Sequence, residues 1–186
     1  MSRSTGVIRV AYGSVPKDSG TFSFYKTMRP RLMEHGIDLI CVSLGVESAQ
    51  LWQSDYADDG CVLLAPLTVN LKRQAKVFVN WCSKEHIDIV MGINSPGILC
   101  AIPHLPAEVK VVARCANAFD EGYRFTMVGR ERLARIVALS PKLKNDLIEN
   151  YGANSTIINL IPNGVDVERF AYCEANNTCV TQRLEL

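Results

Sequence analysis

Short apolar runs, rich in Val, Ile, Leu and Cys, alternate along the chain with segments whose apolar residues recur at helical spacing. The strand-like runs are residues 7–12, 37–44, 61–64, 87–91, 109–113, 135–139 and 156–161. Continuous apolar strands that alternate with helical patterns are typical of a parallel sheet covered by helices. The pattern therefore predicts an α/β fold with a doubly wound, mainly parallel sheet and helices on both faces.

Two helices are predicted between these strands, besides one near the end of the chain. The first follows the loop 13–20, runs through His35 and is stopped by Gly36, and Pro30 should kink it or delay its regular part. The second has an apolar face made of Leu71, Ala75, Phe78 and Cys82. Residues 123–132 form a weaker helix candidate, and residues 92–97 are expected to be a turn.

The clearest helix boundaries lie near the end of the chain. Ser140 can cap the free amides of an opening turn, Pro141 suits the first helical position, and Gly152 supplies a left-handed stop. After the strand 156–161, the run Ile-Pro-Asn-Gly-Val-Asp is expected to turn sharply at Asn163 and Gly164.

This series of elements over residues 135–170 resembles the crossover between the two domains of retaining glycosyltransferases with the GT-B architecture, the large family four. The resemblance implies that residues 1–164 form the Rossmann-like, acceptor-side N-terminal domain. Residues 165–186 would then be an interdomain linker and the start of a missing C-terminal domain. Asn163, Gly164 and Asp166 are the residues that the resemblance places at the interdomain hinge.

The same resemblance implies a reaction. A sugar would move from a nucleotide-sugar donor to a hydroxyl acceptor with retention at the anomeric carbon, and no cofactor is expected besides the donor substrate. In the family the principal donor contacts, including a spaced pair of glutamates, come from the C-terminal domain of the same protein. The chain alone is therefore expected to show little or no transfer activity.

Ligands of open α/β sheets bind outside the carboxyl ends of the strands, which selects the loops to consider. The loop after the first strand contains Gly13, Ser14 and Gly20, and glycines let backbone amides approach a phosphate at a helix start. Family members carry a glycine-containing loop here that approaches the donor phosphates and the acceptor. From the residues alone, this loop can also be a simple strand-to-helix turn that binds no phosphate, because its sequence matches neither GxGxxG nor a Walker loop.

The acceptor-side cleft is expected to contain Asn94, Arg114, Asn117 and Ser140. The segment 111–120 resembles a family element in which a histidine follows a valine-rich strand, but Ala116 occupies the matching position. The catalytic residues therefore remain unknown. Arg114 can offer a planar fork to an anionic group, or it can be an ion-paired surface residue.

Composition and net charge limit the kinds of partner that the chain is expected to bind. The 186 residues carry a formal net charge of +1, which gives no reason to expect nucleic-acid binding. Seven cysteines without a CxxC pair indicate buried, reduced thiols of a cytoplasmic protein, and the spacing of the three histidines predicts no metal site. We expect no secretory leader, because residues 1–6 lack an apolar core, and no apolar stretch approaches the roughly 20 residues of a membrane helix.

Three alternatives stay open. Five arginines between Arg114 and Arg135 could form a basic patch for a phosphorylated acceptor or an anionic membrane surface, or a solvated helix face. A nucleotide-sugar epimerase has the same double-Rossmann architecture. A non-catalytic α/β binding domain is the third interpretation, since fold does not determine function.

Overall fold

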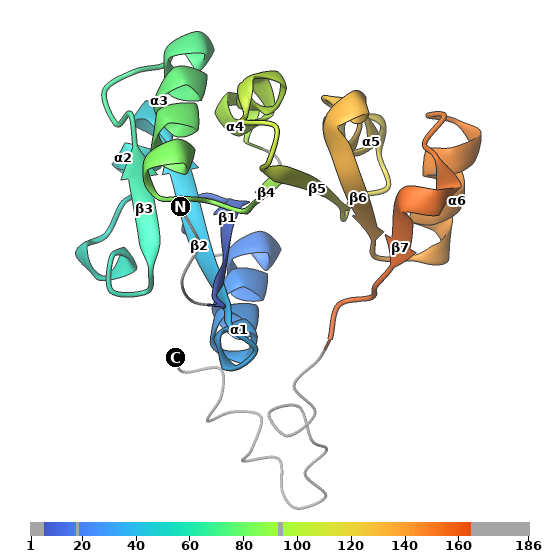
Figure 1. Ribbon diagram of the computed structural model, residues 1–186, viewed down its shortest axis with the longest axis horizontal. Coiled ribbons are helices and arrows are strands. Elements are labelled where there is room, and N and C mark those ends of the chain that lie inside the picture. The colour runs from blue at the N-terminus through green and yellow to red at the C-terminus, as the bar shows by residue number, and fades with distance from the viewer. Residues whose placement is uncertain (1–5, 18, 93–94, 165–186) are drawn as a thin grey trace, which may run out of the picture.

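The computed structural model describes residues 6–17, 19–92 and 95–164. They form a sheet of seven strands in the order β3-β2-β1-β4-β5-β6-β7 (Figure 1). The strands are β1 (Ile8–Gly13), β2 (Ile37–Leu44), β3 (Cys61–Leu64), β4 (Ile89–Gly92), β5 (Lys110–Cys115), β6 (Leu133–Ala138) and β7 (Ile158–Leu160). The helices are α1 (Gly20–Glu34), α2 (Gly45–Gln50), α3 (Leu71–Lys84), α4 (Pro96–Ala101), α5 (Asp120–Thr126) and α6 (Pro141–Glu149).

Every strand pair in this sheet is parallel, which confirms the predicted α/β architecture. β1 lies between β2 and β4, so the direction of winding reverses on the two sides of β1. Such a reversal makes the loops at the carboxyl ends of neighbouring strands diverge and leaves a crevice. The fold thus directs attention to the edge where β1, β4, β5 and β6 end.

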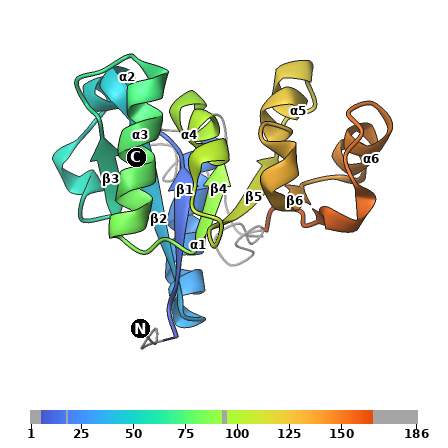
Figure 2. The same ribbon diagram turned by 45° about the horizontal axis from the view of Figure 1, so that its top comes forward.

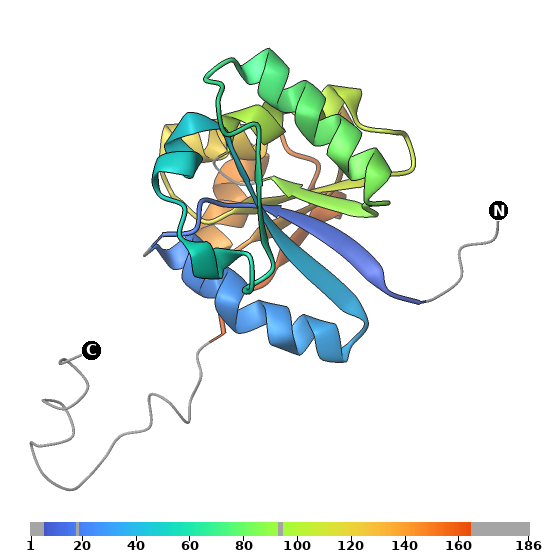
Figure 3. The same ribbon diagram turned by 90° about the vertical axis from the view of Figure 1, so that its left-hand side faces the viewer.

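Helices cover both faces of the sheet, but unevenly. Helix α1 packs on one face, where Tyr12 and Tyr25 belong to one buried apolar cluster. The other face carries α3, α4, α5 and α6, which Figures 2 and 3 show on the side of the sheet opposite α1. On the α1 side of β5 and β6, Val112 and Val137 are only half-buried and Arg135 is exposed.

The boundaries of α1 follow from its sequence. Ser19 caps the helix by accepting a hydrogen bond from the amide of Phe22 at 3.3 Å, and Gly36 just beyond the helix has φ +72°. Pro30 lies inside one helix that runs from Gly20 to Glu34, so the predicted delay is wrong. Pro30 and Lys26 are both exposed, and water can therefore bind the carbonyl that the missing N–H leaves free.

Helix α6 has the predicted start and stop. The Ser140 hydroxyl accepts from the amide of Leu143 at 3.3 Å, and Gly152 has φ +63°. The amide of Ala153 then donates to the carbonyl of Leu147 at 2.9 Å, which satisfies an end carbonyl of the helix. These bonds fix the direction in which the chain enters β7.

Two helix predictions need correction. The turn expected at residues 92–97 is wrong in its second half, because Pro96 begins the buried helix α4. The helix expected at 123–132 starts earlier, at Asp120, and ends at Thr126, and Gly129 (φ +64°) separates it from a short 3₁₀ turn. Helix α2 was not predicted at all.

The remaining predictions about the chain concern its thiols and its surface. Of the five described cysteines, four are buried and Cys100 is exposed, and all five are free thiols, as expected for buried, reduced cysteines. Leu71, expected on the apolar face of α3, is 42% exposed. Among the described helices, none has both the length and the apolar character that crossing a membrane requires.

Candidate functional site

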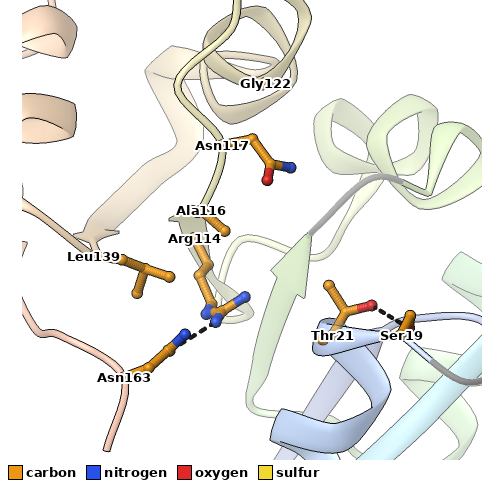
Figure 4. Close-up of a pocket in the computed structure, with 9 residues that line it drawn as sticks. Ser19, Thr21, Arg114, Ala116, Asn117, Gly122, Leu139 and Asn163 are labelled. Atoms are coloured by element: carbon orange, nitrogen blue, oxygen red, sulfur yellow. Dashed lines mark hydrogen bonds between the residues drawn. The ribbon is translucent and has the colours of Figure 1, made fainter.

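A cavity of about 310 Å³ opens at the carboxyl edge of the sheet (Figure 4). Its described lining comes from the start of α1, the segments after β5 and β6, and the segment after β7. The lining residues are Ser19, Gly20, Thr21, Arg114, Ala116, Asn117, Gly122, Leu139 and Asn163. The cavity therefore lies where the parallel topology predicts a ligand site.

Arg114 is the charged residue of this lining. It is the penultimate residue of β5, its side chain points to the α1 side of the sheet, and only 6% of it is exposed. Its guanidinium carbon lies 4.4 Å from the centre of the Phe24 ring, and its Nη2 donates to Oδ1 of Asn163 at 2.9 Å. Figure 4 shows the guanidinium between Asn163 and Thr21. An aromatic ring and an amide thus fix the orientation of the cation.

The charge of Arg114 is not neutralised within the described part of the chain. No carboxylate there forms an ion pair with it, and its Nε is buried without a hydrogen-bond partner. Burial lowers the pKa of Arg114, yet a guanidinium remains protonated in proteins. The cavity wall therefore carries a desolvated positive charge. Without a partner of opposite charge, such a buried cation lowers the free energy of unfolding.

The opening turn of α1 adds partial positive charge to the same cavity. The Ser19 hydroxyl accepts a hydrogen bond from the amide of Phe22, and the Ser19 carbonyl accepts one from the amide of Ser23. The amides of Gly20 and Thr21 remain available to an outside acceptor, as is usual in a first helical turn. No acidic residue occupies this turn. An anion in the cavity would meet both the helix start and the guanidinium.

Of the three residues predicted for the phosphate loop, Gly20 lines the cavity. A Cβ atom added at Gly20 would meet nothing within 4 Å, so its backbone faces open space. Gly13 is not among the lining residues. A Cβ atom there would lie 2.7 Å from Cδ1 of Ile98, so this side of Gly13 faces α4. Its absence of a side chain allows α4 to pack closely against β1.

Ser14 also has a role in packing. Its amide donates to the carbonyl of Val42 at 3.2 Å, and its carbonyl accepts from the Ser43 hydroxyl at 2.6 Å. These bonds tie the end of β1 to β2, and Ser14 is buried beneath the loop outside the described lining.

The residues predicted for the acceptor side divide in a similar way. Arg114 and Asn117 both line the cavity, whereas Ser140 caps α6 next to the lining residue Leu139. Asn94 lies outside the described residues.

Of the predicted hinge residues, Asn163 reaches the cavity through its bond to Arg114. Gly164 is exposed and its φ is not in the left-handed region. The residues that follow it lie outside the described ranges, so the sharp turn stays a prediction. Asp166 lies outside the described residues.

Several lining residues had no assigned role in the sequence analysis. Ser19 and Thr21 flank Gly20, and their hydroxyl oxygens are 3.1 Å apart. Gly122 lets α5 approach the preceding loop, because a Cβ atom there would lie 2.8 Å from the carbonyl oxygen of Asn117. The helix-capping pattern at Ser19 could have revealed this end of α1, whereas the Gly122 contact depends on tertiary packing.

The basic patch considered between residues 114 and 135 does not exist as a unit. Arg114 is buried, the Nε of Arg124 pairs with Asp120 at 2.6 Å, and Arg132 donates to the carbonyls of Leu105 and Pro106. These arginines therefore have separate structural roles. Within the described ranges no cluster of His, Cys, Asp and Glu could hold a metal ion.

A family model described as Glycosyltransferase Family 4 matches residues 63–169. No curated protein sequence matches the chain.

Solved structures share the fold at low sequence identity. A glycosyltransferase from Rickettsia africae superposes with a TM-score of 0.65 at 17% identity, over 97% of this chain and 49% of that one. A UDP-GlcNAc 2-epimerase from Neisseria meningitidis bound to UDP-GlcNAc gives 0.56 at 13%, over 97% and 53%. Sucrose-phosphate synthase from Thermosynechococcus elongatus gives 0.55 at 12%, over 95% and 96%. The chain spans about half the length of the first two.

Proposed function

The chain belongs to glycosyltransferase family 4, and from this premise we propose that it forms the acceptor-side half of a retaining enzyme. The enzyme would transfer a sugar from a nucleotide-sugar donor to a hydroxyl group of an acceptor. The observation that carries the proposal is the cavity at the carboxyl edge of the sheet, with Arg114 and the start of α1 in its wall.

The chemistry suits such a cavity. Glycosyl transfer passes through a positively charged, oxocarbenium-like sugar and releases a negatively charged diphosphate. Fixed donors and a precise position of the acceptor hydroxyl are therefore the main contributions that a protein can make. The amides of Asn117 and Asn163 can orient hydroxyl groups, and Arg114 with α1 provides positive charge nearby.

The described lining contains neither an acid nor a histidine, and Ala116 occupies the place where the resemblance would put a histidine. No described side chain of this cavity can take the proton of an acceptor hydroxyl at neutral pH. We propose that the departing phosphate of the donor takes that proton on the face that the acceptor attacks. Retention of configuration then follows, because the new bond forms on the side from which the nucleotide leaves.

We further propose that residues 1–164 are the N-terminal domain, that residues 165–186 form the linker, and that a donor-binding domain of the same protein follows. Asn163, Gly164 and Asp166 would then stand at the hinge between the domains. The chain covers 49% of the Rickettsia africae protein and 53% of the Neisseria meningitidis protein, which supports this division. On this account the chain alone transfers little or no sugar, and it needs no cofactor beyond the donor.

The test uses the complete coding region that contains this chain. Its product is incubated with UDP-, GDP- and ADP-sugars and a panel of hydroxyl acceptors, and NMR reports the anomeric configuration of the glycoside. The proposal expects free nucleotide together with a glycoside whose configuration matches that of the donor. An inverted product would contradict retention, and a coding region that ends at Leu186 would favour a binding domain over a transferase.

A nucleotide-sugar epimerase is the second candidate, because the Neisseria meningitidis 2-epimerase shares the fold over 97% of this chain. The family match favours transfer. The same assay separates the two, since an epimerase changes the donor sugar without incorporating it into an acceptor.

Contact with a membrane surface is a separate proposal, and it rests on the loop before α3. Leu67 is 94% exposed and Val69 is 77% exposed, and the exposed Lys72 and Arg73 lie in the first turn of α3 just beyond them. Apolar residues beside cations suit an anionic bilayer surface. The chain should cosediment with vesicles that contain phosphatidylglycerol but not with phosphatidylcholine alone, and Leu67→Ser with Val69→Ser should abolish binding. Equal sedimentation of the double variant and the parent chain would contradict the proposal. Met33→Ser, which removes another exposed apolar side chain, is the control and should sediment as the parent chain does.

A further inference from the structure

We infer that the acceptor carries an anionic group, a phosphate or a carboxylate, and that Arg114 and the opening turn of α1 bind it. This inference rests on the proposed function, because it names the class of acceptor for the same cavity. Arg114 is 94% buried, lines the cavity and lacks a carboxylate partner in the described part of the chain.

The chemistry of the wall is complementary to an anion. Its polar groups are a guanidinium, the free amides at the start of α1, two asparagine amides and two hydroxyls. Helix amides and a guanidinium fork both match the oxygen atoms of a phosphate or carboxylate. No described lining residue is acidic, so an anion meets no negatively charged side chain in this wall.

The orientation of Arg114 is fixed before a ligand arrives. Phe24 stacks on one face of the guanidinium, and Asn163 accepts from its Nη2. Asn163 is a neutral acceptor, so it positions the cation without cancelling its charge. A purely structural arginine usually has a carboxylate or several carbonyls as partners, as Arg132 has with the loop at residues 105 and 106.

The size of the cavity indicates which substrate supplies the anion. Its volume of about 310 Å³ is close to the lower limit for ligand sites, about 300 Å³. It corresponds to the space of about ten waters in the liquid, enough for an anionic group with a small carbon skeleton. A nucleotide sugar also has a base and a ribose, and the described lining offers neither an aromatic ring for the base nor a carboxylate for the ribose. In the proposed enzyme the C-terminal domain holds the donor, so this wall is assigned to the acceptor, and the comparison of phosphate with UDP below tests that assignment against the donor diphosphate.

The test measures binding of inorganic phosphate, glucose 6-phosphate and UDP to the chain as it stands. NMR follows the Nε–H signal of Arg114 and the backbone amides of Gly20 and Thr21. Phosphate and glucose 6-phosphate should shift these signals saturably in the millimolar range, and UDP should bind at this place no more tightly than phosphate.

Two variants remove the site by different routes. Arg114→Gln deletes the charge, and binding should weaken about tenfold or more, as expected when a charged hydrogen-bonding group is lost. Gly20→Asp adds a carboxylate that projects into open space at a helix start, where it suits the helix dipole and should leave folding intact. It should also weaken binding about tenfold or more, because like charges meet.

The controls are matched to these variants. Gly20→Asn has nearly the same shape without the charge, so the difference in binding between Gly20→Asn and Gly20→Asp isolates the effect of the added carboxylate. Arg135→Gln removes an exposed arginine from the neighbouring strand, on the same face of the sheet, and should keep binding within about twofold.

The outcomes are distinct. Absence of any phosphate-dependent shift, or equal binding by Arg114→Gln and Arg135→Gln, would overturn the anion site. Binding of UDP at least tenfold tighter than phosphate at the same signals would overturn its assignment to the acceptor. Binding of phosphate does not depend on catalysis, so a failed transfer assay with intact anion binding would reject the proposed function and leave the site standing.

Discussion

Replacement of Gly13 by alanine tests whether this glycine serves packing or phosphate binding. The added Cβ atom would lie 2.7 Å from Cδ1 of Ile98, which is well inside the normal contact distance. Overpacking in a core lowers the free energy of unfolding by about 1–3 kcal/mol. Alanine has less conformational freedom than glycine in the unfolded chain, which raises the free energy of unfolding by about 0.5–1 kcal/mol. Gly13→Ala should therefore lower the free energy of unfolding by up to about 2.5 kcal/mol.

A second substitution isolates the contact. Ile98→Val removes the Cδ1 atom with which the new methyl group clashes, and alone it should destabilise by about 0.5–1.5 kcal/mol. The double variant lacks the clash but keeps the gain from the lost glycine, so it should be about 0.5–1 kcal/mol more stable than Ile98→Val alone, which corresponds to a coupling free energy of about 1–3 kcal/mol. Urea denaturation followed by circular dichroism measures all four proteins.

Additive losses in the double variant would refute this account, because the clash would then not be the cause. The double variant also separates the two interpretations of Gly13. If this glycine only lets α4 pack against β1, the refolded double variant should bind phosphate as the parent chain does. Lost phosphate binding in a stable double variant would restore the role that the sequence analysis gave to Gly13.

Three further predictions concern other parts of the fold. Ser140→Ala removes the cap of α6 and should lower stability by about 1 kcal/mol in urea denaturation, and an unchanged midpoint would contradict the cap. Hydrogen bonds from Lys142 and Tyr123 lower the pKa of Asp146. Above about pH 4 the parent chain should have a higher free energy of unfolding than Asp146→Asn. This difference should disappear as the pH falls through the lowered pKa of Asp146, and a pH-independent difference would contradict the prediction. Iodoacetamide should modify Cys100 but none of the four buried described cysteines, as mass spectrometry of the native chain can show.

The sequence predicted most of the sheet because buried parallel strands are continuous apolar runs. The strands at 37–44 and 61–64 have the predicted bounds, and α6 has the predicted cap and stop. These features depend on local chemistry, such as an N-cap serine and a left-handed glycine, which one segment displays without its neighbours.

Helix α4 escaped prediction although Ser95 and Pro96 repeat the pattern of Ser140 and Pro141. The Ser95 side chain makes no capping bond, and α4 is buried on several sides, so it lacks an amphipathic period. Its assignment depends on its packing against α3 and the sheet, which no local pattern reveals.

The position of the candidate cavity was predicted in outline, and the roles of its residues stay predictions. The carboxyl ends of the strands gave its location, and Gly20, Arg114 and Asn117 all line the cavity. The sequence could not show that Asn163, expected at a hinge, holds Arg114 across the sheet edge, because 49 residues separate the two. Nor could it show that Gly13 faces Ile98 instead of the cavity.

The central claim is that this chain is the acceptor-side half of a transferase and does not bind the donor by itself. Isothermal titration of the chain with UDP-, GDP- and ADP-glucose tests it most directly. The account predicts no binding tighter than about 1 mM, equivalent to about −4 kcal/mol, for any of the three. Micromolar, saturable binding of one nucleotide sugar to the chain alone would contradict it.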